Sequence, residues 1–212
     1  MTDVLYSANY GGWDPPRSQP VPVQMYTDET APIPRDDPRM AVAYLSDLSY
    51  PRLAAKWWKV RPDLACPDAG ITVWIDGSMT LLVPDLLSRA VEELGSDDAL
   101  FMRHPWRDCI YDEREASHPN EKYDGQPTDE QVMAYRNAGH PAHWGLAHSG
   151  LIVRRNNRRV RAFDERWWQE IALWSIQDQL SLPFLLRTTP LRWHWWPTDP
   201  ITAGWVRWGS FN

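Results

Sequence analysis

The chain has 212 residues, of which 43% are hydrophobic and 24% charged, and its formal net charge is -6 at pH 7. This composition is typical of a folded domain, and the acidic balance argues against a nucleic-acid-binding protein, which needs a basic face to neutralise phosphates. The length suits one sizeable core, so we expect a single domain over residues 1–212.

Strands and helices are expected to alternate along the chain. Strands are predicted at Val4–Ala8, at 21–28, at Ile71–Ile75, from Ala99 onward and at Leu151–Arg154. Helices are predicted within Pro51–Val60, before Gly95, from Thr128 in a capping box with Gln131 to Gly139, and onward from an N-cap at Asp164. Proline-rich loops are expected at 11–21 and 29–39. The alternation predicts an α/β fold with a mostly parallel central sheet flanked by helices, in which ligands bind beyond the carboxyl ends of the strands.

The stretch ITVWIDGSMTLLVP is an apolar strand that stops at one acid, Asp76, followed by Gly77 and Ser78. In an extended chain Asp76 and Ser78 point to the same side, and Gly77 lets a ligand approach the backbone. Two oxygen side chains on one side can hold a hard cation that bridges to phosphates, so Mn²⁺ or Mg²⁺ is the expected cofactor. A plain D-G-S turn is the alternative.

Four other segments carry polar groups with two readings each. The segment MRHPWRDCIYDERE is either a substrate-binding loop or a solvated, self-paired turn, and Asp178 in SIQDQLS is either a base or a helix cap. His194 in LRWHWWP is either a packed residue or a metal ligand, and as a ligand it would favour Mn²⁺ over Mg²⁺. The basic run RRNNRRVR is either a solvated turn or a phosphate-facing loop.

Absent features narrow the class of protein. The sequence holds no G-x-G-x-x-G, G-x-x-x-x-G-K-[ST], G-x-S-x-G or H-E-x-x-H motif, and its two cysteines, Cys66 and Cys109, predict neither a disulfide framework nor a zinc cluster. No apolar run reaches the roughly 20 residues that span a bilayer, and the N-terminus does not resemble a signal peptide. We therefore expect a cytoplasmic protein without a membrane partner.

Arginine outnumbers lysine 19 to 3, which indicates a GC-rich coding sequence, such as an actinobacterial or bacteriophage gene.

The order of the motifs resembles the glycosyltransferase-like family, long catalogued as a domain of unknown function, that includes plant mucilage and pollen-wall-related glycosyltransferases. The resembling segments cover about residues 4–187, leaving a Trp-rich tail at 188–212; they are YSANYGGWD, VQMYTD, PRLAAKWWKVRP, VWIDGSM, RHPWRDCIYDE, EQVMAYRNAGHP, GLIVRRN and WWQEIALWSIQDQLSLPF. The resemblance implies a GT-A-type fold, a nucleotide-sugar-binding α/β domain with a D-x-D-like metal motif after a central strand. Asp76 matches the first acid of that motif, whereas Ser78 stands where the second acid would be, so the metal would also draw on His194, diphosphate oxygens and water.

The resemblance also assigns roles to residues. It implies that the donor nucleotide sugar, of the UDP or GDP type, meets Tyr6, Ser7, Tyr10, Asp28, Arg52, Lys56, Asp76 and Gly77. It places Asp178 and Gln179 near the transferred sugar, with Asp178 as the first choice of base and Glu113 as the second. The acceptor, a glycan or a protein (a virion protein if the source is a phage), is expected at His104, Trp106 and Arg107.

Two other functions stay open. Ser78 and the Trp-rich tail are compatible with an inactive GT-A-like module that binds carbohydrate or serves in assembly. A nucleotidyltransferase also pairs a metal with a nucleotide on an α/β sheet, but NYGGWDPP lacks the nearby lysine of its usual glycine-rich loop.

Overall fold

The structure is a computed structural model that describes residues 2–12, 17, 19–28, 40–44 and 50–209. The proline-rich loop expected at 29–39, and most of 13–18, lie outside the described residues.

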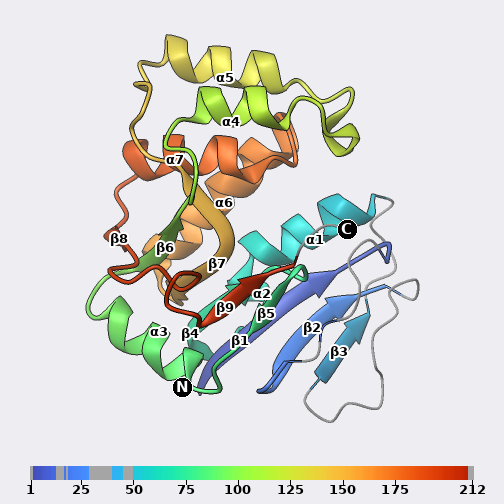
Figure 1. The fold of residues 1–212 in the computed structure, drawn as a ribbon, viewed down its shortest axis with the longest axis vertical. Coiled ribbons are helices and arrows are strands. Elements are labelled where there is room, and N and C mark those ends of the chain that lie inside the picture. The colour runs from blue at the N-terminus through green and yellow to red at the C-terminus, as the bar shows by residue number, and fades with distance from the viewer. Residues whose placement is uncertain (1, 13–16, 18, 29–39, 45–49, 210–212) are drawn as a thin grey trace.

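A mixed α/β fold is built around one large sheet (Figure 1). Its strand order is β3-β2-β1-β4-β7-β6-β8, seven strands among the described residues. The bounds are β1 Thr2–Asn9, β2 Val23–Thr27, β3 Met40–Tyr44, β4 Ala69–Ile75, β6 Ala99–Arg103, β7 Ala147–Arg155 and β8 Trp193–Trp195. All neighbours pair in parallel except β7, which is antiparallel to both β4 and β6. The expected mostly parallel sheet is confirmed.

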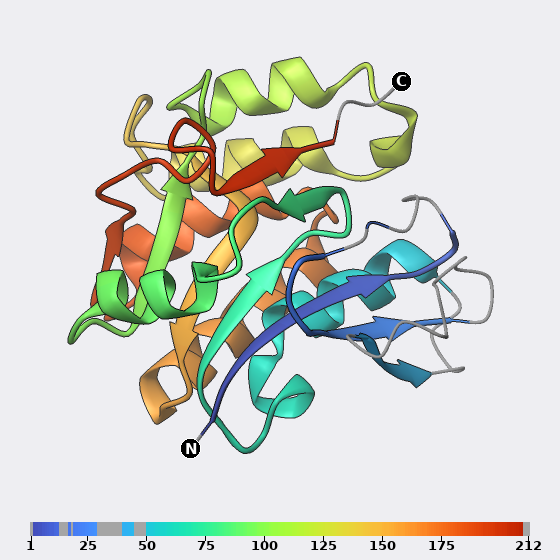
Figure 2. The ribbon, with the colours of Figure 1, turned by 60° about the horizontal axis from the view of Figure 1, so that its bottom comes forward.

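Helices and one pair of short strands cover the sheet. The helices are α1 Pro51–Val60, α2 Pro62–Ala65, α3 Leu86–Leu94, α4 Ile110–Ser117, α5 Thr128–Asn137, α6 Arg158–Leu173 and α7 Asp178–Thr188, with a short 3₁₀ turn at Glu121–Tyr123. Two short strands, β5 Met79–Leu81 and β9 Val206–Trp208, pair antiparallel. Figure 2 shows α3, β5 and β9 on the side of the sheet that faces the viewer, with α1 and α6 behind it.

The two faces of the sheet bury two different cores because successive strand residues point to opposite sides. Tyr6 and Trp74 pack with α1, α6 and α7, whereas Leu5, Val73 and Ile75 pack with α3, β5 and β9. A strand buried on both faces reads as a continuous apolar run, which is the pattern of β4.

Two helix starts differ from the sequence prediction. Helix α6 begins at Arg158, not after Asp164, and the Asn157 side chain caps it by accepting from the backbone N–H groups of Arg159 and Val160. Asp164 lies inside the helix, where it is buried and paired with Arg154 at 2.8 Å. The capping box at Thr128 is also wrong, since α5 has Pro127 at its N-cap and no side-chain cap.

The basic run 154–161 joins β7 to α6, as the reading of a turn between two elements predicted, and Arg158, Arg159 and Arg161 are exposed, but the run is not solvated throughout. It spans the end of β7 and the first turn of α6, and Arg154 is buried at 1% exposure. The Arg154 guanidinium donates to the Tyr6 hydroxyl and to the backbone carbonyl of Lys59, and so ties β7 to β1 and α1.

Candidate active site

A cleft of about 480 Å³ opens where β1 and β4 end. Its walls come from the ends of these strands, the start of β7, helix α1, the start of α7 and the turn at Glu121–Tyr123. Because β7 runs antiparallel to β4, its beginning lies at the same edge of the sheet as the end of β4. The cleft therefore occupies the edge at which parallel α/β sheets bind ligands.

All three lysines of the sequence line this cleft: Lys56, Lys59 and Lys122. Lys56 and Lys59 come from α1, one turn apart on the same face, as their spacing predicts. Lys122 reaches the cleft from the 3₁₀ turn, and burial, with Lys56 nearby, lowers its pKa to about 8. Together with Arg52 these residues give one wall of the cleft a strongly basic character.

The centre of the site is the Lys59 ammonium group, which is buried at 1% exposure. Its Nζ lies 2.7 Å from Asp178 Oδ2, 3.2 Å from Asp76 Oδ1 and 3.1 Å from Ser149 Oγ. Burial alone would lower the pKa of Lys59, but the two carboxylates outweigh it and raise the pKa. The lysine is therefore charged throughout the physiological pH range.

Asp178 is the first residue of α7, and its carboxylate is paired with two lysines. Lys56 Nζ lies 3.0 Å from the same Oδ2 atom that meets Lys59, while the Ser149 hydroxyl donates to Oδ1 at 3.2 Å. Burial would raise the pKa of Asp178, but the two ammonium groups overcome it and hold the pKa well below the usual carboxyl range. A carboxylate held in this state is a weak proton acceptor at neutral pH.

Asp76 follows β4 directly and begins a tight turn. Its backbone N–H donates to the Gly150 carbonyl at 2.8 Å, and its own carbonyl accepts from the N–H of Met79 at 2.9 Å. The Trp74 indole N–H donates to Asp76 Oδ1 at 2.6 Å. Although burial opposes it, the charges of Lys59 and Lys56 lower the pKa of Asp76, so the carboxylate is ionised.

The cleft offers a hard cation one carboxylate, that of Asp76, with the hydroxyl of Ser78 in the same turn. The other carboxylate nearby, Asp178, is already occupied by two lysines. This donor set fits Mg²⁺ or Mn²⁺ only in the common arrangement in which one carboxylate, water and substrate phosphates share the ion. An ion held this way needs the diphosphate to complete its coordination.

His148 enters the cleft from β7. Its Nδ1 accepts from the N–H of Gly150 at 3.3 Å. Its ring packs edge-to-face with Trp208, with 4.3 Å between the ring centroids and 86° between the ring planes. Burial lowers the pKa of His148, which keeps the imidazole neutral. With Nδ1 accepting, the proton of the neutral ring lies on Nε2, so His148 is a hydrogen-bond donor toward a ligand.

The structure brings together many of the residues expected from sequence. Those that line the cleft are Tyr10, Arg52, Lys56, Asp76, Gly77, Ser78, Asp178 and Gln179. Tyr10 has its hydroxyl fixed by the Trp58 indole at 2.8 Å, and the Gln179 amide donates to the Ala147 carbonyl at 3.1 Å.

Other expected residues lie behind the walls. Tyr6 is fully buried, and its hydroxyl donates to the Lys59 carbonyl at 3.0 Å, so it supports α1 from below. Ser7 is buried at 2% exposure beside it on β1. Asp28 accepts from the N–H of Gly11 at 2.9 Å and so holds the turn after β1. None of these three is among the residues that line the cleft.

The loop before α4 is a compact, self-paired structure next to the cleft. Arg107 Nε lies 2.6 Å from Glu113 Oε2, and His104 Nδ1 accepts from the N–H of Arg107 at 3.1 Å. Glu113 in turn accepts at 2.8 Å from the amide of Gln177, which does line the cleft. Burial raises the pKa of Glu113, although Arg107 opposes the shift.

His194 is not a partner of Asp76. It lies on β8, which is three strands away from β4 in the sheet, a distance of about 14 Å at the usual strand spacing. Its Nδ1 lies 2.8 Å from Asp97 Oδ2, and its Nε2 is 3.1 Å from the Glu93 carbonyl. The expectation that His194 helps to bind the same ion as Asp76 is therefore wrong, because the sheet order separates them.

Sequence reasoning missed several residues of the cleft: Lys122, Tyr123, His148, Ser149, Gln177 and Trp208. No local pattern marks them, since they come from the 3₁₀ turn, β7, the start of α7 and β9. Lys59 was also missed, although it shares one face of α1 with Lys56, which was expected in the site. The scarcity of lysine in an arginine-rich chain is the one signal that could have singled out Lys59 and Lys122.

Comparison with protein families gives a match to the TOD1/MUCI70 glycosyltransferase-like domain over residues 49–194. The chain belongs to this family. The matched region runs from α1 to β8 and so includes Lys59, Asp76, His148 and Asp178, whereas Tyr10 and Trp208 lie outside it. No curated protein matches the chain in sequence.

Solved glycosyltransferase structures resemble this family member in fold. The apo structure of the bifunctional glycosyltransferase WbbM matches with a TM-score of 0.55 and 10% identity, over 92% of this chain and 39% of that chain. Apo mouse xyloside xylosyltransferase 1 matches with a TM-score of 0.47 and 9% identity, over 91% of this chain and 83% of that one. The match to WbbM shows that the chain has a GT-A-like fold, and the chain spans well under half of the WbbM chain. Within the described residues, no helix is long and apolar enough to cross a membrane.

Proposed function

We propose that this family member is a glycosyltransferase that moves a sugar from a nucleoside diphosphate sugar to a hydroxyl of a glycan or protein, assisted by Mn²⁺ or Mg²⁺. The observation that carries the proposal is the group formed by Asp76, Lys56, Lys59 and Asp178 at the carboxyl edge of the sheet. We further propose that residues 1–212 act as one catalytic domain.

The basic wall suits the leaving group of this reaction. When the bond between sugar and diphosphate breaks, negative charge develops on the diphosphate, and fixed cations at that point lower the barrier. Lys56 and Lys59 are held in place by Asp178 before any ligand arrives. A divalent ion on Asp76 would supply further positive charge to the same oxygens.

The two ends of the cleft suit the two ends of a nucleotide sugar. Tyr10, at the end of β1, offers a ring for the base, close to the basic face of α1. His148, Gln177 and Gln179 lie at the other side, where neutral donors and acceptors would meet the hydroxyl groups of the sugar. Gln177 is oriented by the Tyr123 hydroxyl at 2.7 Å and by Glu113 at 2.8 Å.

Asp178 is proposed as an organiser of the lysines, not as the base expected from sequence. Two ion pairs and a low pKa make proton abstraction by this carboxylate unfavourable. Glu113, the second choice, lies behind Gln177 and is bound to Arg107, so its proposed role is to orient Gln177.

The acceptor is proposed to bind at two tryptophans at the mouth of the cleft. Trp106 is 70% exposed and stacks on Trp208 with the ring planes 15° apart. Trp208 lines the cleft, and flat indole faces bind the apolar faces of sugar rings.

Binding of the donor can be measured by thermal unfolding with UDP or GDP, in the presence and absence of Mn²⁺. At about 100 times the dissociation constant a nucleotide stabilises the fold by about 2.7 kcal/mol, which raises the melting temperature by about 5–10 °C. Asp76→Ala should remove the part of the shift that depends on Mn²⁺, whereas Asp68→Ala, an exposed acid in a turn, should keep it. If neither nucleotide shifts the wild type, the proposed function is wrong.

A binding module without catalysis remains the second candidate, because Ser78 stands in place of a second carboxylate and Trp106 is widely exposed. Turnover of a nucleotide sugar separates the two functions. Turnover that disappears in Asp76→Ala would exclude the binding module, and donor binding without any turnover would favour it.

A further inference from the structure

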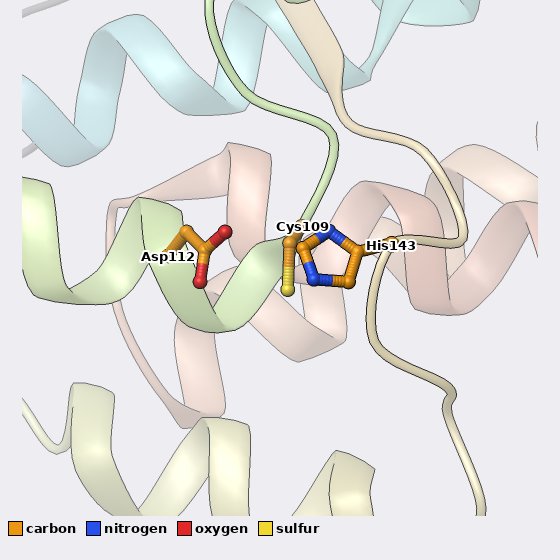
Figure 3. A group of neighbouring side chains, drawn as sticks. All are labelled: Cys109, Asp112 and His143. Atoms are coloured by element: carbon orange, nitrogen blue, oxygen red, sulfur yellow. The ribbon is translucent and has the colours of Figure 1, made fainter.

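A second group of metal-ligand side chains lies away from the cleft, between the start of α4 and the loop before β7. The thiol of Cys109, the carboxylate of Asp112 and the imidazole of His143 place ligand atoms within 4.8 Å of one another. Figure 3 shows the three side chains pointing toward a common centre. None of them is among the residues that line the cleft.

The backbone holds these residues together without help from a ligand. Cys109 is the N-cap of α4, and Asp112 follows three residues later on the same side of the helix. The loop that carries His143 is joined to this segment by hydrogen bonds from the N–H of Gly145 to the Asp108 carbonyl at 2.8 Å and from the Tyr111 hydroxyl to the His140 carbonyl at 2.6 Å. His143 itself has a φ of +55°, a conformation that non-glycine residues rarely adopt.

A fourth residue, Asp108, orients the imidazole. Its Oδ1 lies 2.7 Å from His143 Nδ1, which leaves Nε2 as the ring nitrogen available to a metal. Metal-binding histidines usually have this arrangement, in which the second nitrogen is held by a carboxylate that fixes the tautomer and strengthens the ligand. The contact with Asp108 thus holds the imidazole of His143 in an orientation that suits a metal ligand.

The ligand types select the metal. One thiolate, one imidazole and one carboxylate form a set that suits Zn²⁺, whereas Mg²⁺ and Mn²⁺ prefer oxygen ligands. Tetrahedral bonds of the usual zinc lengths place ligand atoms about 3.5 Å apart. Asp112 and His143 are exposed, so rotation of their side chains can close the remaining gap while the buried Cys109 stays in place.

We propose that Cys109, Asp112 and His143 bind a Zn²⁺ ion, with Asp108 orienting His143 and water as the fourth ligand. Binding releases the thiol proton to solvent as the zinc–sulfur bond forms. The ion joins the segment that carries His104, Trp106 and Arg107 to the loop before β7. The sequence predicted no zinc cluster because it offers only two cysteines, and the fold supplies the other ligands.

Titration of the reduced protein with Co²⁺ tests this site through the near-ultraviolet charge-transfer band that only a cobalt–thiolate bond gives. We expect the band to saturate at one equivalent and to disappear on adding Zn²⁺. Cys109→Ser should abolish it, whereas Cys66→Ser, which changes the only other cysteine, should keep it. Asp108→Asn should weaken the affinity about 10- to 100-fold without removing the band.

His143→Ala keeps the test valid if substitution of the buried Cys109 harms folding, because His143 is 63% exposed. It should weaken Co²⁺ binding, whereas His118→Ala, at the other end of the same helix, should not. Asp76→Ala should keep the band, because Asp76 lies in the cleft and not at this site. The result of this test is therefore independent of whether the proposed function is correct. Absence of the band in the wild type, or its persistence in Cys109→Ser, would overturn the proposal.

Discussion

At the scale of single residues, the proposed metal binding in the cleft depends on the oxygen ligands that Asp76 and Ser78 offer. Asp76 is ionised and fixed by Trp74 and Lys59, whereas Ser78 contributes a hydroxyl in the same turn. A single carboxylate explains why an ion would need the diphosphate of the donor to be held firmly.

Ser78→Asp should restore a second carboxylate and raise the affinity for Mn²⁺ in the absence of nucleotide. We expect a gain of at least tenfold, equivalent to about 1.4 kcal/mol, measurable by isothermal titration calorimetry. Thr80→Asp, at a position on β5 that is not among the residues lining the cleft, serves as the control and should have no such effect. Equal Mn²⁺ affinity in the wild type and Ser78→Asp would argue against metal binding at this turn.

Lys59→Met should weaken the binding of a nucleoside diphosphate by tenfold or more, because it removes the buried cation that faces both Asp76 and Asp178. It should also destabilise the fold, since the buried Asp178 carboxylate would then keep only the Lys56 ammonium as its cation. The double variant Lys59→Met/Asp178→Asn restores the charge balance and is expected to recover stability but not binding. Recovery of both in the double variant would show that Lys59 acts only through stability.

At the scale of elements, β7 and α6 are joined by one buried ion pair. Arg154 Nη1 lies 2.8 Å from Asp164 Oδ1, and both side chains are 1% exposed. The same guanidinium donates to the Tyr6 hydroxyl at 2.7 Å, which lies directly under the α1 end that carries Lys59. The position of Lys59 thus depends on Arg154 and Asp164, neither of which is among the residues that line the cleft.

Arg154→Met should lower the free energy of unfolding by about 3–5 kcal/mol, because it leaves the Asp164 carboxylate buried without its cation. Chemical denaturation measures the loss. The double variant Arg154→Met/Asp164→Leu should recover much of it, since a well-packed apolar pair can replace a buried ion pair. Arg161→Met, an exposed position on α6, should change the unfolding free energy by no more than about 0.5 kcal/mol.

At the scale of the whole molecule, three buried histidines from separate segments make stability depend on pH. Burial, with Arg107 nearby, lowers the pKa of His104 to about 4, and burial with Arg187 nearby lowers the pKa of His140 to about 4. Burial also lowers the pKa of His148. The folded chain keeps these rings neutral at a pH where the unfolded chain, with pKa values of about 6.5, has already taken up protons.

Stability should therefore be complete above about pH 6.5 and fall as the pH is lowered toward 4, by about 3 kcal/mol for each of His104 and His140. Urea denaturation at a series of pH values measures the slope. His140→Gln should make the slope shallower, whereas His118→Gln, at an exposed position, should leave it unchanged. A slope equal in the wild type and His140→Gln would contradict the assigned cause.

Local patterns predicted most of the elements correctly. The helix predicted within Pro51–Val60 is α1, and the apolar run before Asp76 is β4. The errors occurred where a polar side chain had a tertiary partner: Asp164 looked like an N-cap but is paired with Arg154 inside α6. Helix α4 and strand β3 were not predicted, and the weakly amphipathic α4 packs against α7 and α5.

The sequence by itself determined the fold class, the family resemblance and the acid that ends β4, because these depend on periodicity and on residues close together in the chain. Only the tertiary structure decided which distant side chains share the cleft with Asp76. The order of strands in the sheet is set by long-range pairing, and this order places His148 on the strand next to Asp76 and His194 three strands away. The packing of α1 on the sheet brings Lys59 to Asp76. Likewise, the low pKa of Asp178 comes from two lysines on another helix.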